Sequence, residues 1–125
     1  MIIKESAENY LESIYVIKQS KGFVRSIDVA NDLSVSKPSV SVAMKNFREE
    51  GYVVVDKDGY LDLTEKGLEI AKRVYERHEI ISEVLMRLGV SREAALEDSC
   101  KIEHVISPES FERIKEFLAR LKKED

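Results

Sequence analysis

The segment Cys100-Lys101-Ile102-Glu103-His104 brings together three side chains that bind divalent metal ions. Glu103 and His104 follow Cys100 by three and four residues, so on a helix the three side chains share one face. Cys100 is the only cysteine of the chain, and His104 is one of two histidines. Thiolate, carboxylate and imidazole together favour iron, manganese, zinc, cobalt or nickel over calcium and magnesium. The spacing therefore indicates a transition-metal site.

A stable site of this kind usually takes ligands from more than one helix. The other histidine, His78, lies on a predicted helical stripe, and Asn9 and Glu12 share one face of the first predicted helix. Each residue also has an ordinary explanation, because a lone cysteine packs as a small hydrophobe and a core histidine can simply be hydrogen-bonded. We favour the metal site because it uses the sole cysteine and both histidines.

The first half of the chain predicts three helices followed by a β hairpin. The expected elements are a helix over about residues 4–19, a short helix capped by Ser26, a third helix with Pro38 in its first turn, and strands at residues 52–55 and 60–63. This order of elements is typical of a winged helix-turn-helix, which is a DNA-binding motif.

The second half predicts helices only. We expect Thr64 to cap a long helix whose apolar stripe passes through His78 and reaches Leu88. A second helix should carry the Cys100 cluster, and Ser107-Pro108 should begin the last one. The predicted fold is therefore mainly α with a small β wing, with a winged helix-turn-helix domain at residues 1–64 and a helical domain at residues 65–125.

Composition limits the class of protein. The chain has 125 residues, of which 43% are hydrophobic and 35% are charged, which is typical of a globular protein. Its apolar runs are too short to cross a bilayer, and its N-terminus lacks the pattern of a secretory signal. With one cysteine we expect no internal disulfide and a reducing, cytoplasmic location. The net charge of −4 argues against a generally basic surface, so any DNA contact must use a local patch.

Five separated segments resemble the diphtheria-toxin-repressor family of metal-dependent transcriptional regulators, and in size its manganese transport regulator branch. They are Asn9-Tyr10-Leu11-Glu12-Ser13-Ile14-Tyr15, Ser36-Lys37-Pro38-Ser39-Val40-Ser41, Leu63-Thr64-Glu65-Lys66-Gly67, Arg77-His78 and Cys100-Lys101-Ile102-Glu103-His104-Val105-Ile106-Ser107. The resemblance covers essentially the whole chain. It implies that the second domain binds metal and forms a homodimer.

The resemblance also implies a ligand set and a metal. Family metal-ligand positions fall on Glu12, His78, Cys100, Glu103 and His104, and Asn9 stands at a further ligand position. Cys100 is like the iron-responsive members and Glu12 is like the manganese branch, so the expected cofactor is Mn²⁺ or Fe²⁺, while Zn²⁺ or Co²⁺ can bind in vitro. The expected function is a metal-dependent repressor of metal-homeostasis promoters.

Polar and basic residues on or before the third helix are candidate contacts to double-stranded DNA. Serine hydroxyls and helix N-terminal amides suit phosphates, and a proline can contact a thymine methyl. A basic residue before the second helix, Arg25, and one in the wing, Lys57, are further candidates. The full set is Arg25, Ser36, Lys37, Pro38, Ser39, Ser41, Lys45 and Lys57. The alternative for each is an ordinary cap or a solvated charge.

Three other functions remain open at this level. A thiol hydrolase would use Cys100 as nucleophile and His104 as base, but both lie on one helix and no glycine-rich oxyanion loop is present, so we expect no enzyme. A winged-helix regulator that does not respond to metal would leave the cysteine and histidines structural. A constitutive zinc-stabilised DNA-binding protein would unfold when stripped of metal.

Overall fold

The structure is a computed structural model and describes residues 5–124. It divides into two compact units, Met1–Arg73 and Val74–Asp125, with the division inside the longest helix, α4 (Glu65–Arg87). The predicted domain boundary at residue 64 coincides with the start of that helix, whereas the first turns of α4 pack with the N-terminal unit.

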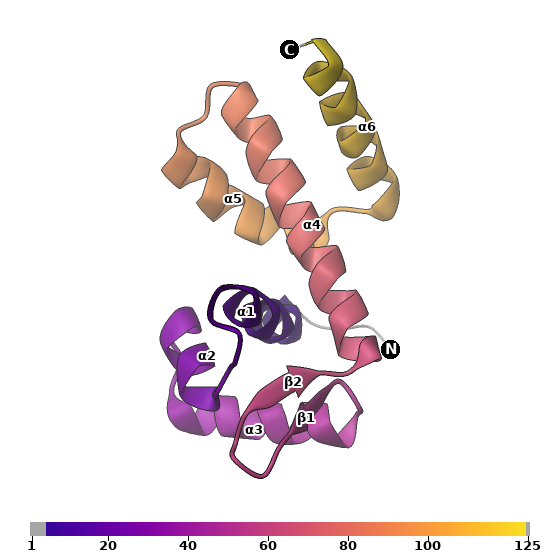
Figure 1. The fold of residues 1–125 in the computed structure, drawn as a ribbon. Coiled ribbons are helices and arrows are strands. Elements are labelled where there is room, and N and C mark those ends of the chain that lie inside the picture. Colours follow the sequence, from indigo (N-terminus) through magenta and orange to yellow (C-terminus); the bar gives the residue numbers. More distant parts are fainter. Residues whose placement is uncertain (1–4, 125) are drawn as a thin grey trace. The chain divides into compact units, whose positions relative to one another are not determined.

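Three helices and a two-stranded wing form the N-terminal unit, as predicted (Figure 1). Their bounds are α1 (Glu5–Lys21), α2 (Ser26–Leu33), α3 (Lys37–Glu49), β1 (Val53–Val55) and β2 (Leu61–Leu63). Each strand is one residue shorter than predicted, because Tyr52 and Tyr60 lie just outside the ladder. The sheet is antiparallel and pairs Val53 with Leu63 and Val55 with Leu61.

The helix ends follow local rules, with one exception. α1 carries Glu5 and Glu8 in its first turn and Lys18 and Lys21 in its last, as the helix dipole favours. Ser36 caps α3, and its Oγ accepts the Ser39 N–H at 3.2 Å.

The predicted cap of α2 is wrong. Arg25, and not Ser26, is the residue before the helix, and the Asp28 carboxylate accepts the Arg25 N–H at 2.9 Å. The carboxylate of Asp28, in the first turn of α2, therefore caps the helix by accepting the N–H of the preceding residue. This contact is one of the two hydrogen bonds of a capping box.

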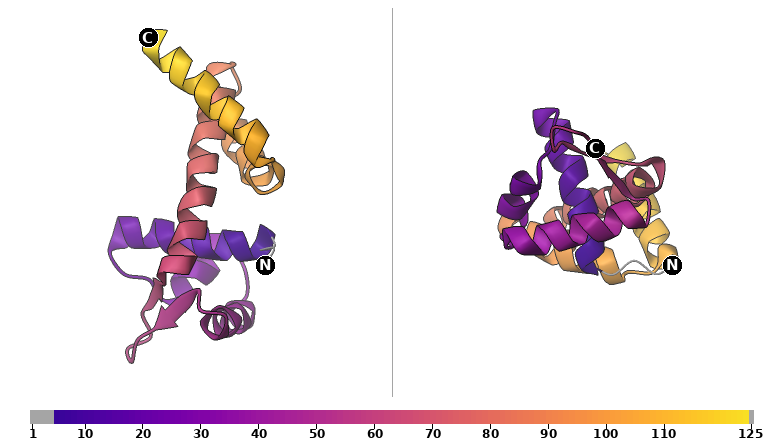
Figure 2. Two further views of the ribbon diagram at one scale, coloured as in Figure 1. Left: turned by 90° about the vertical axis from the view of Figure 1, so that its right-hand side faces the viewer. Right: turned by 90° about the horizontal axis from the view of Figure 1, so that it is seen from below.

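The wing is held by a tight turn and by the segment that precedes α2. The Asp56 carboxylate accepts the N–H groups of Asp58 and Tyr60, each at 2.9 Å. Arg25 and Tyr60 form an isolated antiparallel bridge, and the Leu61 N–H donates to the Val24 carbonyl at 2.8 Å. In the right-hand view of Figure 2 the hairpin lies beside α3. Both elements carry exposed side chains, such as Lys45 of α3 and Lys57 of the wing turn.

An apolar core fills the N-terminal unit. Its members come from all three helices, both strands and the start of α4; among those with no exposed surface are Leu11, Ile14, Val24, Val29, Val40 and Ala71. Gly67 lies where α4 meets the wing, and a Cβ there would overlap the Tyr52 carbonyl oxygen. The glycine is therefore required by a close backbone approach.

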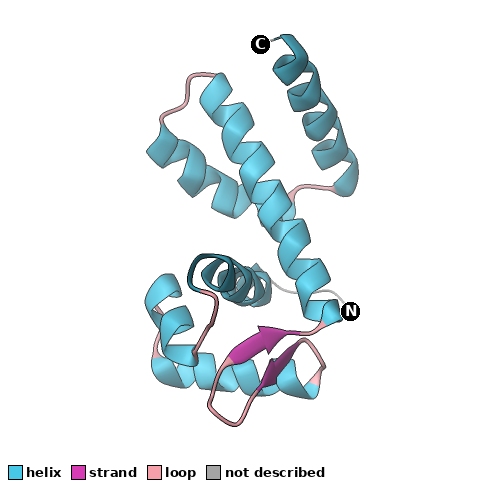
Figure 3. Cartoon of the chain, viewed as in Figure 1, coloured by secondary structure: helices cyan, strands magenta, loops and turns pink. Residues whose placement is uncertain are grey.

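The C-terminal unit is helical among its described residues (Figure 3), with α5 (Arg92–Val105) and α6 (Pro108–Glu124) following α4. Ser91 caps α5, and its Oγ accepts the Ala94 N–H at 3.2 Å. Buried apolar side chains come from each of the three helices: Val74, Ile81, Ala95, Phe111 and Leu118. Leu88, the last residue of the predicted apolar stripe, follows the end of α4 at Arg87 and is 71% exposed. Within residues 5–124, none of the helices has the length and apolar content needed to cross a bilayer.

Candidate metal centre and nucleic-acid interface

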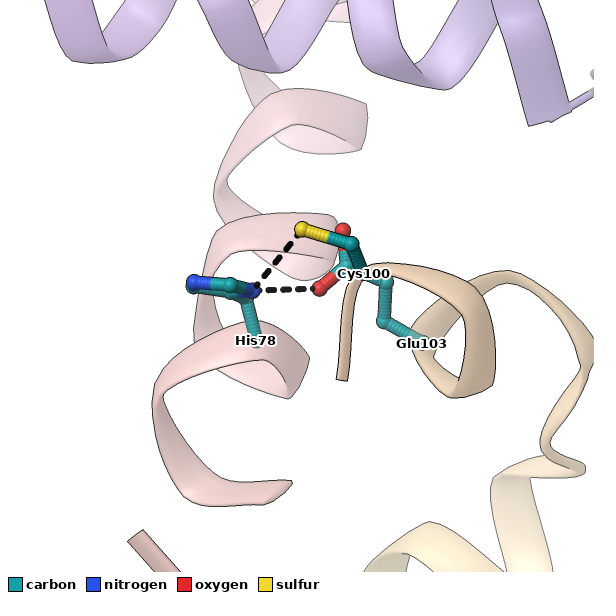
Figure 4. Close-up of side chains that lie close together, drawn as sticks. All are labelled: His78, Cys100 and Glu103. Carbon is teal, nitrogen blue, oxygen red and sulfur yellow. Dashed lines mark hydrogen bonds and ion pairs between the residues drawn. The ribbon is translucent and has the colours of Figure 1, made fainter. Parts of the chain in front are cut away.

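Three potential metal ligands converge inside the C-terminal unit (Figure 4). His78 comes from α4, and Cys100 and Glu103 come from α5. The His78 Nδ1 atom lies 2.9 Å from Glu103 Oε2 and 3.9 Å from Cys100 Sγ. One donor atom from each residue lies within 4.8 Å of the other two. The convergence depends on two helices that are separated by a turn, which sequence spacing alone does not show.

The three members of this cluster differ in burial: Cys100 is exposed and His78 is half-buried, whereas Glu103 is buried. Glu103 is 1% exposed, and within the described chain its Oε1 atom has no hydrogen-bond partner. The nearest imidazole nitrogen to Oε1, His104 Nε2, is 3.5 Å away, which is long for a hydrogen bond. Burying a carboxylate that is incompletely satisfied is costly unless a positive charge compensates it. A bound cation at this site would therefore stabilise the buried carboxylate.

The residues fit a transition-metal ion. Ligand bonds to such ions are about 2.0–2.3 Å long, so two donors on one ion lie at most about 4.6 Å apart. The observed spread of 4.8 Å reaches that limit with a small side-chain adjustment. A thiolate, an imidazole and a carboxylate are also the donor set that manganese, iron, zinc and cobalt share. Metal ligands bind in their deprotonated forms, so ion binding at such a site releases protons.

The remaining predicted ligands occupy different places. The His104 side chain is on α5 beside Glu103 and is 1% exposed. Asn9 and Glu12 are half-buried residues of α1 in the N-terminal unit. Their participation in the metal centre stays a prediction.

Two supporting residues were missed by sequence reasoning. Ser99 is fully buried, and its Oγ lies 3.4 Å from His78 Nδ1 while donating to the Leu96 carbonyl at 3.2 Å. Arg77 donates to the backbone carbonyls of Glu103 and Ile106. The sequence signal that could have indicated them is their position, because Ser99 directly precedes Cys100 and Arg77 directly precedes His78.

The residues predicted to contact DNA are all exposed. They lie at the N-terminal end and along one side of α3, before α2, and in the wing: Arg25, Ser36, Lys37, Pro38, Ser39, Ser41, Lys45 and Lys57. Lys37 and Ser41 line a shallow hollow together with Ser26 and Ile27 of α2. The hydroxyls of Ser36 and Ser39 lie 2.8 Å apart, so both take part in the cap of α3. A side chain of α3 that sequence reasoning omitted, Val42, is 62% exposed.

Arg25 is already engaged with the wing. Its Nη1 atom donates to the Asp58 carbonyl at 2.8 Å, and its guanidinium lies 4.2 Å from the centre of the Tyr60 ring. Hydrogen bonding to the Tyr60 side chain, with the charges of Asp56 and Asp58 nearby, raises the pKa of Arg25 above its usual range. A permanently charged side chain therefore braces the wing turn, and its exposed edge remains available to a phosphate.

A winged helix-turn-helix joined to a helical unit with clustered metal ligands defines a metal-dependent DNA-binding transcriptional regulator, and not an enzyme. Residues 3–67 match the N-terminal DNA binding domain of iron dependent repressors, and residues 64–125 match the iron dependent repressor metal binding and dimerisation domain. The chain therefore belongs to the iron-dependent, or diphtheria-toxin, repressor family of metal-dependent regulators, as its motifs indicated.

Relatives in sequence and structure agree with this assignment. The HTH-type transcriptional regulator MntR of Lysinibacillus sphaericus is 38% identical over 109 residues, covering 87% of this chain and 78% of the relative. MntR of Bacillus subtilis is 34% identical over 96% of this chain and 84% of its own length.

Among solved structures, the manganese regulator SloR is 32% identical with a TM-score of 0.79 and IdeR of T. acidophilum is 26% identical with a TM-score of 0.81. Each match covers 90% of this chain and 53% of the solved chain, so this chain spans about half the length of those two regulators.

Proposed function

We propose that this protein is a repressor of metal-homeostasis promoters whose operator affinity is set by Mn²⁺ or Fe²⁺ bound at His78, Cys100 and Glu103. The observation that carries this proposal is the buried Glu103 carboxylate, whose Oε1 has no hydrogen-bond partner in the described chain although a thiol and an imidazole lie beside it. His104, Glu12 and Asn9 complete the ligand set by resemblance to the family. A solved relative named as a manganese regulator and a family named for iron support either ion, and the donor set also accepts Zn²⁺ or Co²⁺ in vitro.

The chain's own charges explain why this site responds to an ion. The Glu103 carboxylate and a Cys100 thiolate are like charges within one small cluster. Two such charges about 4 Å apart repel by roughly 4 kcal/mol at an effective dielectric constant near 20. A bound divalent ion supplies the positive charge that reverses the sign of this interaction. A difference of a few kcal/mol in ion affinity between two conformations is enough to move most molecules from one to the other.

The active species we propose is a homodimer in the cytoplasm, where the single cysteine stays reduced. The C-terminal unit, which matches a dimerisation domain, carries large exposed apolar side chains at Leu88 and Val105 that suit contact with a second copy. Ion binding would fix the spacing of the two α3 helices at about one DNA turn, roughly 34 Å, on a pseudo-palindromic operator.

On DNA, α3 is the reading helix. Ser36, Ser39 and the N-terminal amides of α3 contact phosphate, and Pro38 contacts a thymine methyl. Lys37, Ser41, Lys45, the exposed edge of Arg25 and Lys57 of the wing add further contacts. Val42 has no polar group and is exposed on α3, so we assign it to a second thymine methyl.

The decisive experiment measures operator affinity by fluorescence anisotropy under anaerobic conditions, with chelator, Mn²⁺ or Fe²⁺. We expect tight binding only with the ion. Glu103→Gln should abolish the ion dependence, and Glu116→Gln, an exposed glutamate of the same unit, should retain it. Equal affinity with chelator and with saturating ion would establish a regulator that metal does not control. Unfolding on chelation, followed by circular dichroism, would indicate a zinc-stabilised protein instead.

Lys45→Ala tests the reading helix. Removing one phosphate contact should weaken operator binding and lower the slope of log affinity against log salt by about one unit. Lys122→Ala, which removes an exposed lysine of α6, is the charge-matched control. An unchanged salt slope would remove Lys45 from the interface.

Val42 can be tested separately by replacing single thymines of the operator with uracil, which lacks the methyl group. One such replacement should weaken binding of the wild-type protein and have no further effect on Val42→Ala. Independent effects of the two changes at every thymine would exclude the contact.

A further inference from the structure

Arg77 binds the backbone of the residue that supplies the buried carboxylate. Its Nη1 atom donates to the Glu103 carbonyl oxygen at 3.2 Å and to the Ile106 carbonyl oxygen at 2.9 Å. Its guanidinium lies over the Phe111 ring, 5.3 Å from the ring centre, within the range of a cation–π contact. The hydrogen bonds of this cation therefore go to the C-terminal end of α5.

That end of α5 needs a donor. An α-helix leaves its last four carbonyl groups without intrahelical partners, and α5 ends at Val105. The chain then turns through the extended residue Ile106 into α6, where Pro108 has no N–H to offer. Arg77 supplies the missing donor from the neighbouring helix, and its positive charge also suits a helix C-terminus.

Two consecutive residues of α4 thus hold the same residue of α5. His78 contacts the Glu103 side chain at 2.9 Å, and Arg77 contacts the Glu103 backbone. The backbone contact fixes the turn that carries Cys100 and Glu103 at one height and rotation relative to His78. Metal ligands need to be held within about 0.5 Å of their productive positions, so contacts that fix the ligand-bearing backbone affect the affinity for the ion.

We propose that Arg77 is a positioning residue of the metal centre, which presets the α5 ligands against His78 through the Glu103 and Ile106 carbonyls. This inference rests on the metal site proposed above. It differs from a purely electrostatic role, in which a nearby positive charge would oppose ion binding and its removal would strengthen binding.

The test compares Co²⁺ affinity of the full chain in wild type, Arg77→Met and Arg77→Lys. Met keeps an unbranched stem against Phe111 without hydrogen bonds or charge, and Lys keeps the charge without the planar fork. We expect about 10- to 100-fold weaker binding for Arg77→Met, typical of lost ligand support, and an intermediate loss for Arg77→Lys. The near-ultraviolet sulfur-to-cobalt absorption band should also weaken, because Cys100 would be misplaced. Arg113→Met removes an exposed arginine of the same unit and should bind as wild type.

The outcomes separate this role from the site itself. Tighter Co²⁺ binding by Arg77→Met, or wild-type affinity and absorption in both Arg77 variants while His78→Ala binds weakly, would overturn the positioning role alone. Wild-type binding by His78→Ala would overturn the metal site. Circular dichroism of the ion-free variants shows whether they fold, and if Arg77→Met does not, Arg77→Lys decides the question.

Discussion

The interiors of the two units differ in kind. The N-terminal unit encloses one continuous apolar cluster, in which side chains such as Leu11 and Val24 have no exposed surface. Its buried polar side chains have hydrogen-bond partners: Arg73 donates to Glu8, and Ser13 donates to Asp32. The interior of the C-terminal unit contains the buried carboxylate of Glu103, the buried hydroxyl of Ser99 and, partly covered, the guanidinium of Arg77. An apolar core is complete when it is packed, whereas a buried carboxylate with an oxygen that accepts no hydrogen bond is not. The interior of the N-terminal unit therefore stabilises its fold by apolar packing, whereas the interior of the C-terminal unit contains a candidate ion-binding site.

Leu11→Ala should have the largest effect on stability. Removing a fully buried leucine of the N-terminal core loses burial and leaves a cavity, which costs about 2–5 kcal/mol of unfolding free energy. Urea unfolding monitored by circular dichroism measures the loss. Val16→Ala, at a position of the same helix that is 39% exposed, should cost far less. Equal losses in the two variants would show that the N-terminal core is not the source of its stability.

Glu103→Gln should change ion affinity and leave the stability of the ion-free protein nearly the same. The amide keeps the shape of the side chain but loses its charge, so we expect at least a roughly 100-fold weaker affinity, equal to about 2.7 kcal/mol. Calorimetric titration with Mn²⁺ measures the ion affinity, and urea unfolding in the presence of chelator measures the stability of the ion-free protein. A large loss of stability with unchanged ion affinity would show that Glu103 stabilises the fold of the C-terminal unit and does not bind the ion.

Gly67→Ala should destabilise the N-terminal unit by about 1–3 kcal/mol, because the added methyl group overlaps the Tyr52 carbonyl oxygen. At an exposed helical glycine the same change would instead stabilise by about 1 kcal/mol. The shift of the thermal unfolding midpoint shows whether the substitution destabilises or stabilises the protein. Glu69→Ala, at an exposed position of α4, is the control for helix propensity. A stabilised Gly67→Ala variant would show that α4 can move away from the wing.

The smallest effect we expect is a pH-dependent one at the start of α2. The hydrogen bond from the Arg25 backbone N–H, and then the Lys21 ammonium, hold the pKa of Asp28 below its usual 3.8. The folded state thus favours the ionised form. This stabilisation is present in full above pH 3.8 and is lost as the pH falls from 3.8 through the lower folded-state pKa.

Asp28→Asn should remove that acid-dependent step, which urea midpoints at neutral and acid pH would measure. Asp98→Asn changes an exposed aspartate for which no such contact is described, and it should leave the step intact. If the wild type and Asp28→Asn lose stability in parallel below pH 3.8, the Asp28 contact has no effect on folding.

The elements of the N-terminal unit were largely predictable from local chemistry. Ser36 and Pro38 begin α3, Asp56 and Gly59 close the wing turn, and apolar spacing selects the buried side of each helix. The local signals failed at Ser26, because the Asp28 carboxylate accepts the Arg25 N–H instead. Apolar spacing reached Leu88 but did not show that this side chain is exposed.

By itself the sequence determined which helices form and placed Cys100 and Glu103 on one face, because helical spacing is a local property. Only the tertiary structure brought His78 to within 2.9 Å of Glu103, left one carboxylate oxygen without a hydrogen bond, and set Arg77 on the end of α5. Those contacts join residues more than twenty positions apart in the chain. They depend on how α4 packs against α5, which burial across the whole unit decides and no local pattern encodes.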